Sequence, residues 1–107
     1  MGACVLVTTT VASRDAADQL AGALVRGRLA ACAQVSGPVA STWWWRGAVE
    51  QGDEWICRLK TTRARLPALE TELARLHPYE LPELTVVPLG GSRAYLAWIE
   101  EAVRDEG

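Results

Sequence analysis

The stretch STWWWRGAVEQ, residues 41–51, places three tryptophans in a row beside an Arg-Gly pair. Successive side chains of a β-strand point to opposite faces, so Trp43 and Trp45 would share one face and Trp44 would take the other. Arg46-Gly47 suits a tight turn, although it is not one of the strongest hairpin dipeptides. The stretch therefore predicts the tip of a hairpin, and both faces of that hairpin need cover.

Strand patterns continue on both sides of this tip. Upstream, ACAQV (31–35), the pair Gly37-Pro38 and VASTWWW (39–45) predict one strand interrupted by a bend or bulge. Downstream, EWICRLK (54–60) alternates with a period of two. The alternation divides this strand into one face with Trp55, Cys57 and Leu59 and another with Ile56, Arg58 and Lys60.

The first third of the chain reads as a strand followed by a helix. ACVLVTTTV (3–11) is short, apolar and β-branched, as in a strand that is buried on both faces. Ser13 is placed to cap a helix, with Asp15 in its first turn near the positive end of the helix dipole. Gly27 marks the expected end of that helix.

The last third contributes a helix, a strand and another helix. Pro67 fits only the first turn of a helix, so we expect the second helix to begin after Thr62 and to run to about Leu76, where His77-Pro78 stops it. ELTVVPL (83–89) predicts a fourth strand, and its proline suggests an edge or a strand end. Ser92 caps a final helix.

This order, βαββαβ plus a C-terminal helix, is that of an α+β ferredoxin-like sandwich, with a four-stranded antiparallel sheet and helices on one face. Its length of 107 residues fits a single domain, residues 1–107. The apolar run Val5-Leu6-Val7 needs cover on both faces of the sheet, and the helices supply only one. We therefore expect a second copy of the chain, in a closed symmetric oligomer, to cover the other.

Composition and charge exclude several classes of protein. The net charge is −2 with no basic stripe, which argues against electrostatic binding to nucleic acid. No apolar run reaches the roughly 18 residues of a membrane span, and no signal peptide is recognisable, so we expect a cytoplasmic protein. Cys4, Cys32 and Cys57 are odd in number and far apart, which favours buried thiols over disulfides or structural zinc.

Six short segments follow one another along the chain: TTT (8–10), LAACAQV (29–35), WWWRGAVEQ (43–51), LKTT (59–62), HPYELPE (77–83) and AYLAWI (94–99). Together they resemble the CutA divalent-cation-tolerance family, over about residues 4–103. The resemblance implies a ferredoxin-like subunit in a tight homotrimer, similar in architecture to PII signal-transduction proteins, whose long hairpin packs on a neighbouring subunit. It also implies a role in tolerance to divalent metals, and some members are described as copper-binding.

The candidate metal ligands are Cys32, His77 and Glu80. Thiolate and imidazole together suit copper, and a cleft between subunits would complete the site with Glu80 or with residues of a neighbour. Each candidate also has a structural reading: Cys32 as a core thiol, and His77 as a helix stop whose ring is hydrogen-bonded locally. Some members of the family carry a suggested copper-binding cysteine where this chain has Thr9.

The candidate ligand cleft comprises Lys60, Tyr79 and Glu83. Lys60 would bind a small anion or pair with Glu83 if its sheet face meets a cleft between subunits, and otherwise it is a solvated surface residue. Tyr79 has a turn or interface role as its alternative. The three tryptophans are predicted trimer contacts, with Arg58 or Lys60 lying against them.

No arrangement typical of an enzyme is present. There is no Ser/His/Asp set, no phosphate-binding glycine loop and no recognisable carboxylate pair, so we expect no catalysis; a cysteine-dependent hydrolase at Cys32 is the weakest of three alternatives. The leading interpretation is a homotrimeric metal-tolerance protein that binds copper or another divalent cation near Cys32 and His77. The second is a PII-like sensor of a small anion, or an interaction scaffold.

Overall fold

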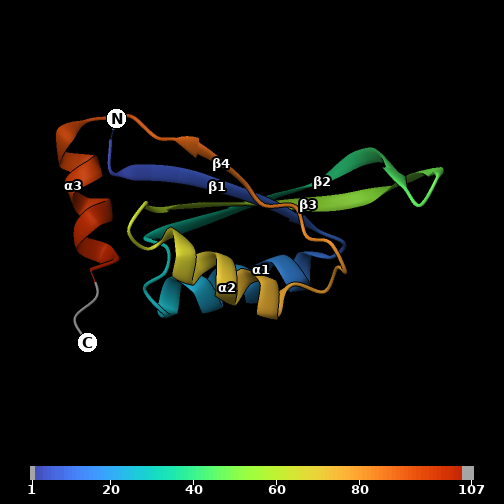
Figure 1. Ribbon diagram of the computed structural model, residues 1–107, viewed down its shortest axis with the longest axis horizontal. Coiled ribbons are helices and arrows are strands. Elements are labelled where there is room, and N and C mark those ends of the chain that lie inside the picture. Colours follow the sequence, from blue (N-terminus) through green and yellow to red (C-terminus); the bar gives the residue numbers. More distant parts are fainter. Residues whose placement is uncertain (1, 105–107) are drawn as a thin grey trace.

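The computed structural model describes residues 2–104, which form one four-stranded antiparallel sheet and three helices (Figure 1). The strands lie in the order β2-β3-β1-β4, as expected for the ferredoxin-like sandwich. The short edge strand ends at Pro88, where a missing N–H costs no ladder hydrogen bond. The elements are β1 (Cys4–Val11), α1 (Arg14–Arg26), β2 (Cys32–Trp45), β3 (Ala48–Thr62), α2 (Leu66–Leu76), β4 (Thr85–Pro88) and α3 (Arg93–Ala102).

Local sequence signals set the ends of the helices. The Ser13 hydroxyl accepts a hydrogen bond from the Ala16 N–H at 3.1 Å, which caps α1, and Gly27 follows its last turn. Helix α2 begins at Leu66 with Pro67 in its first turn, later than Thr62 as predicted. The Ser92 hydroxyl caps α3 by accepting from the Tyr95 N–H. The predicted helix boundaries are thus confirmed.

The hairpin of β2 and β3 is longer than the sequence pattern predicted. Pairing continues to Trp45↔Ala48, so β3 begins at Ala48 and not at Glu54, because Arg46 and Gly47 form a two-residue turn with φ of 52° and 82°. Both strands therefore run well past the body of the subunit (Figure 1). The predicted interruption of β2 is confirmed as a register shift between Ser36 and Val39.

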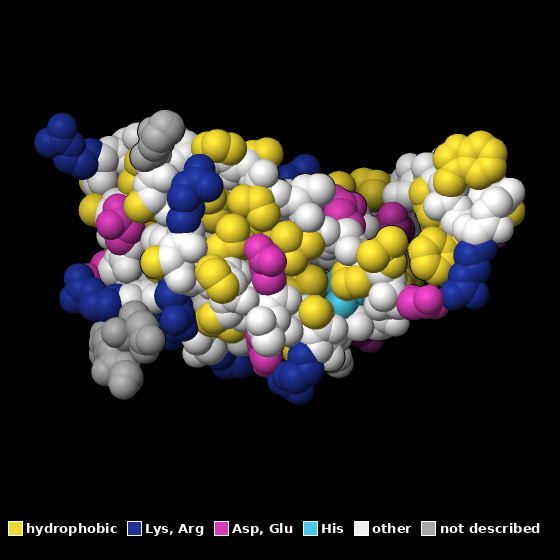
Figure 2. Space-filling view, viewed as in Figure 1, with side chains coloured by type: hydrophobic (Ala, Val, Ile, Leu, Met, Phe, Trp, Pro, Cys, Tyr) yellow, Lys and Arg dark blue, Asp and Glu magenta, His cyan; other side chains and the backbone are white. Residues whose placement is uncertain are grey.

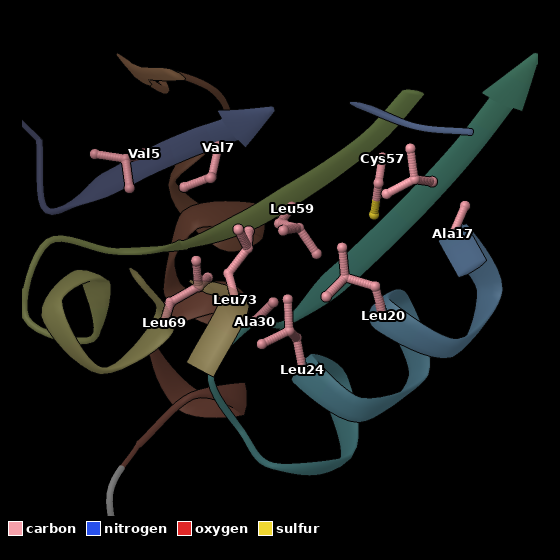
Figure 3. Packing of buried hydrophobic residues seen from close by; sticks show 11 residues of the cluster. Val5, Val7, Ala17, Leu20, Leu24, Ala30, Cys57, Leu59, Leu69 and Leu73 are labelled. Carbon is pink, nitrogen blue, oxygen red and sulfur yellow. The ribbon is translucent and has the colours of Figure 1, made fainter. Parts of the chain in front are cut away.

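The hydrophobic core lies between the sheet and the pair α1 and α2 (Figure 3). Val5 and Val7 of β1 and Leu59 of β3 point toward Leu20, Leu24, Leu69 and Leu73 of the two helices. All of these side chains are buried. One face of the sheet is thus covered by helices within the subunit, as expected.

The opposite face, which we call the open face, carries Leu6, Thr8, Arg58 and Val87. The register places these residues together, since Leu6 pairs with Val87 and Thr8 pairs with Arg58. Helix α3 covers only the end of this face, where the Cys4 thiol contacts the Leu96 carbonyl oxygen at 3.8 Å. No helix among residues 2–104 is long and apolar enough to cross a membrane.

Candidate functional site

A groove of about 860 Å³ lies between the projecting hairpin and the segment 78–83, which follows α2. We call it the hairpin groove. Figure 2 shows hydrophobic, acidic and basic side chains gathered at this end of the molecule. The groove is lined by Thr10, Ser41, Thr42, Trp43, Trp44, Trp45, Glu50, Glu54, Pro78, Tyr79, Glu80, Leu81, Pro82 and Glu83.

An ion pair joins the two walls of the groove near the hairpin tip. Arg46 Nη2 lies 2.6 Å from Glu80 Oε1, and the guanidinium lies over the Trp45 ring at 5.1 Å from its centroid. Both charged side chains are mostly exposed, so the pair contributes only about 0–1 kcal/mol to stability. It positions the tip but adds little to the free energy of folding.

Deeper in the groove, Tyr79 and Glu54 form a short hydrogen bond. The Tyr79 hydroxyl donates to Glu54 Oε2 at 2.7 Å, and Glu54 is only 8 % exposed. Burial, together with this carboxylate, raises the pKa of Tyr79 well above its usual value. The phenol therefore stays protonated and acts as a fixed donor to the carboxylate.

His77 anchors the segment at the start of the groove. Its Nδ1 accepts a hydrogen bond from the Tyr79 N–H at 3.1 Å, so the neutral ring carries its proton on Nε2. Nε2 donates to the Thr10 carbonyl at 2.9 Å and to the Thr9 hydroxyl at 3.0 Å. Burial lowers the pKa of His77, which favours this neutral form. Both ring nitrogens are thus used within the subunit, as in the structural reading of this residue.

Cys32 and His77 do not meet within one subunit. Cys32 pairs with Lys60, which pairs with Leu6 of the open face. His77 instead contacts Thr9, three residues along β1 from Leu6, where the side chain points to the helix-covered face. The two candidate ligands therefore lie on opposite faces of the sheet. Residues 2–104 contain no group of three or more His, Cys, Asp or Glu side chains suited to a metal ion.

Lys60 and Glu83, which would pair only if a cleft between subunits brought them together, have other partners within the subunit. Lys60 Nζ lies 3.2 Å from the Tyr95 hydroxyl and 5.2 Å from the ring centroid of the same tyrosine, because α3 covers that end of the open face. Glu83 instead accepts a hydrogen bond from the Thr10 hydroxyl at 3.3 Å.

Within the subunit, the cation that lies over Trp45 is Arg46, and contacts of Arg58 or Lys60 with tryptophans of a neighbouring subunit stay a prediction. Trp98 lies beside Tyr95 with ring centroids 5.5 Å apart and stays 46 % exposed in the subunit.

The hairpin groove thus brings together six of the predicted site residues and excludes three. Tyr79, Glu80, Glu83 and the three tryptophans line it, whereas Cys32, Lys60 and His77 do not. Sequence reasoning missed Glu50 and Glu54. Glu54 was the first residue of the predicted strand 54–60, but the polar residues 48–53 gave no sign that this strand continues to the hairpin tip, so neither glutamate was linked to a site.

Comparison with known proteins gives consistent matches over most of the chain. Residues 5–102 match the family model described as CutA1 divalent ion tolerance protein. The divalent-cation tolerance protein CutA of Thermus thermophilus is 38 % identical over 97 residues, covering 90 % of this chain and 94 % of that protein. The chloroplastic CutA 1 protein of rice is 32 % identical over 94 % of this chain, which spans 58 % of the rice protein.

The match extends to solved structures. The crystal structure of CutA from Xylella fastidiosa superposes with a TM-score of 0.92 at 33 % identity, covering 96 % of this chain and all of that chain. The order of strands and helices described above is therefore shared with a solved protein of this kind.

Proposed function

The chain belongs to the CutA1 divalent ion tolerance family, and we propose that it serves tolerance to divalent cations as a homotrimer in the cytoplasm. The family match over residues 5–102 is the observation that carries this proposal. The three cysteines are unpaired in the structure, which fits a reducing compartment. The family is named for cation tolerance, and we expect no catalytic activity.

The trimer is supported by the apolar surface that one subunit leaves uncovered. Trp44 and Leu81 at the hairpin end are 74 % and 71 % exposed, and Val87 on the open face is about half exposed. Exposed apolar residues in such number mark contact surfaces in proteins of this size. A threefold assembly that packs hairpins and open faces against neighbouring subunits would cover both regions.

Light scattering tests the assembly directly. We expect a particle of about three times the 11.6 kDa chain mass at micromolar concentration. A stable monomer or a dimer at that concentration would refute the trimer while leaving the fold intact.

Metal binding requires ligands from more than one subunit, because the described part of one subunit offers no complete site. Of the candidate ligands, Cys32 remains available to bind a metal ion. Its thiol is free and half-buried, and it lies on the open face at the end that α3 covers. A thiolate is a preferred ligand of Cu(I). We propose Cys32 as the soft ligand of a site between subunits, to which His77 contributes only if it gives up a hydrogen bond.

Competition titration with Cu(I) under reducing conditions tests this site. Cys32→Ser should weaken copper binding at least tenfold, and Cys4→Ser, a matched change at a buried thiol, should leave it unchanged. His77→Gln separates the two expected ligands, because it should alter stability and not affinity. Equal copper affinities for wild type and Cys32→Ser would remove the site.

A further inference from the structure

The hairpin groove carries an unbalanced negative charge. Four of its lining residues are glutamates, Glu50, Glu54, Glu80 and Glu83, and none of the described residues that line it is Lys or Arg; Arg46 lies beside it, at the hairpin tip. Arg46 is already paired with Glu80. The other three carboxylates lie around the groove without a Lys or Arg at ion-pair distance among residues 2–104. The charge of the groove therefore favours a cationic occupant.

Glu54 points to the same conclusion from its burial. Glu54 is 8 % exposed as a residue, and a carboxylate in such a position is normally paired with a cation, because removing a charge from water is costly. Within the described residues, its one hydrogen-bond donor is the neutral Tyr79 hydroxyl, on Oε2. No fully buried side-chain oxygen there lacks a partner, so Oε1 keeps some exposure to solvent, and Glu54 lines the groove. This oxygen is placed to accept from a ligand.

The aromatic walls select the kind of cation. Trp43, Trp45 and Tyr79 line the groove beside the carboxylates, and indole faces attract cations and pack against methylene groups. Trp45 already holds the Arg46 guanidinium in this way. The combination of carboxylates and tryptophans suits an alkylammonium group better than a strongly hydrated metal ion.

The spacing of the charges selects the shape of the cation. The glutamates are spread around a groove of about 860 Å³ and do not converge into a cluster suited to a metal ion. An extended ligand with several ammonium groups, separated by apolar methylene chains, matches spread carboxylates in a groove that tryptophans also line.

We propose that the hairpin groove binds an aliphatic polyamine, with one ammonium group hydrogen-bonded to Glu54 Oε1 and its methylene chain lying against the tryptophans. The site is distinct from the copper site proposed at Cys32, so either proposal can fail alone. It also reverses the expectation of an anionic ligand, since Lys60 lies outside the groove and the groove is acidic.

Isothermal titration of the purified 107-residue chain with spermidine tests the proposal. We expect saturable binding with one site per subunit, accompanied by a change in tryptophan fluorescence. Glu54→Gln should weaken the affinity at least tenfold, and Glu83→Gln at least threefold. Glu70→Gln removes the same charge from an exposed position on α2, away from the groove, and should change the affinity less than twofold. A neutral diol of similar length should not bind.

Several results would overturn the proposal. These are the absence of saturable binding up to millimolar spermidine, an equal loss of affinity in Glu70→Gln, or complete displacement of spermidine by Mg²⁺ at equal charge concentration. If Glu54→Gln instead lowers the particle mass and leaves the affinity unchanged, a neighbouring subunit supplies the cation and the proposal is wrong. Should Glu54→Gln fail to fold, Glu83→Gln and the exposed Glu50→Gln decide the matter by the same threefold criterion.

Discussion

Removal of the Tyr79 hydroxyl should destabilise the protein more than removal of any exposed tyrosine hydroxyl. In Tyr79→Phe, Glu54, which is 8 % exposed, loses the one hydrogen-bond donor that its carboxylate has within residues 2–104. Hydrogen bonds to charged groups contribute about 1.5–3 kcal/mol to stability, and this variant also leaves a buried acceptor unpaired. We therefore expect the free energy of unfolding to fall by about 2 kcal/mol. With a urea dependence of about 2 kcal/mol/M, the unfolding midpoint should fall by about 1 M.

The assay is urea unfolding followed by circular dichroism, at one fixed protein concentration because assembly affects stability. Tyr95→Phe is the matched control, since it removes a hydroxyl from an exposed tyrosine that contacts Lys60. That control should cost less than about 0.5 kcal/mol. The double variant Glu54→Leu with Tyr79→Phe should recover most of the loss, because neither polar partner is then buried alone. Equal midpoints for the two Tyr→Phe variants, or additive losses in the double variant, would refute the reasoning.

Three further predictions concern titration and assembly. Burial lowers the pKa of His77 below 6.5, so its contribution to stability is present above pH 6.5 and is lost as the pH falls below that value. The urea midpoint should therefore be lower at pH 5.5 than at pH 7.5. An equal fall of the midpoint in His77→Gln would contradict this assignment. Burial raises the pKa of Cys57 from 9.0 to about 11, so the free energy of unfolding should fall as the pH rises between these values. Under reductant, the drop in urea midpoint from pH 8 to pH 10.5 should be smaller in Cys57→Ala than in the wild type. An undiminished alkaline loss in that variant would exclude the thiol as its source. Trp44→Ala should make the particle mass measured by light scattering depend on concentration, whereas intact trimers of native stability would show that this side chain does not hold the assembly.

The fold was predictable from the sequence because its signals are local and agree with one another. Ser13, Pro67 and Ser92 each mark the start of a helix by a cap or a first-turn proline, and the structure places each where expected. The length of β3 was not predictable in the same way. Residues 48–53 are polar and lack the period-two alternation of a half-buried strand, because the hairpin projects beyond the core and neither face is buried in the subunit.

The site was less predictable, because the sequence does not say which face of the sheet each residue meets. The period of two correctly placed the side chains of Lys60 and Leu59 on opposite faces of the sheet. It could not show that α3 covers the end of the open face, where the Lys60 ammonium group contacts the Tyr95 hydroxyl. Residue type and motif context alone put Cys32 and His77 in one site. The registers of two strand pairs were needed to show that they lie on opposite faces.

The three tryptophans connect assembly with ligand binding. Trp43, Trp44 and Trp45 were predicted as contacts between subunits, and all three line the hairpin groove. Trp44 is too exposed for a single subunit to account for it, while Trp45 is engaged by Arg46 within the subunit. If neighbouring subunits cover the hairpin as we propose, they must do so beside Glu54. If the cation binds the hairpin groove more tightly when a neighbouring subunit covers it, cation binding stabilises the trimer. Assembly then raises the affinity for the cation by the same factor.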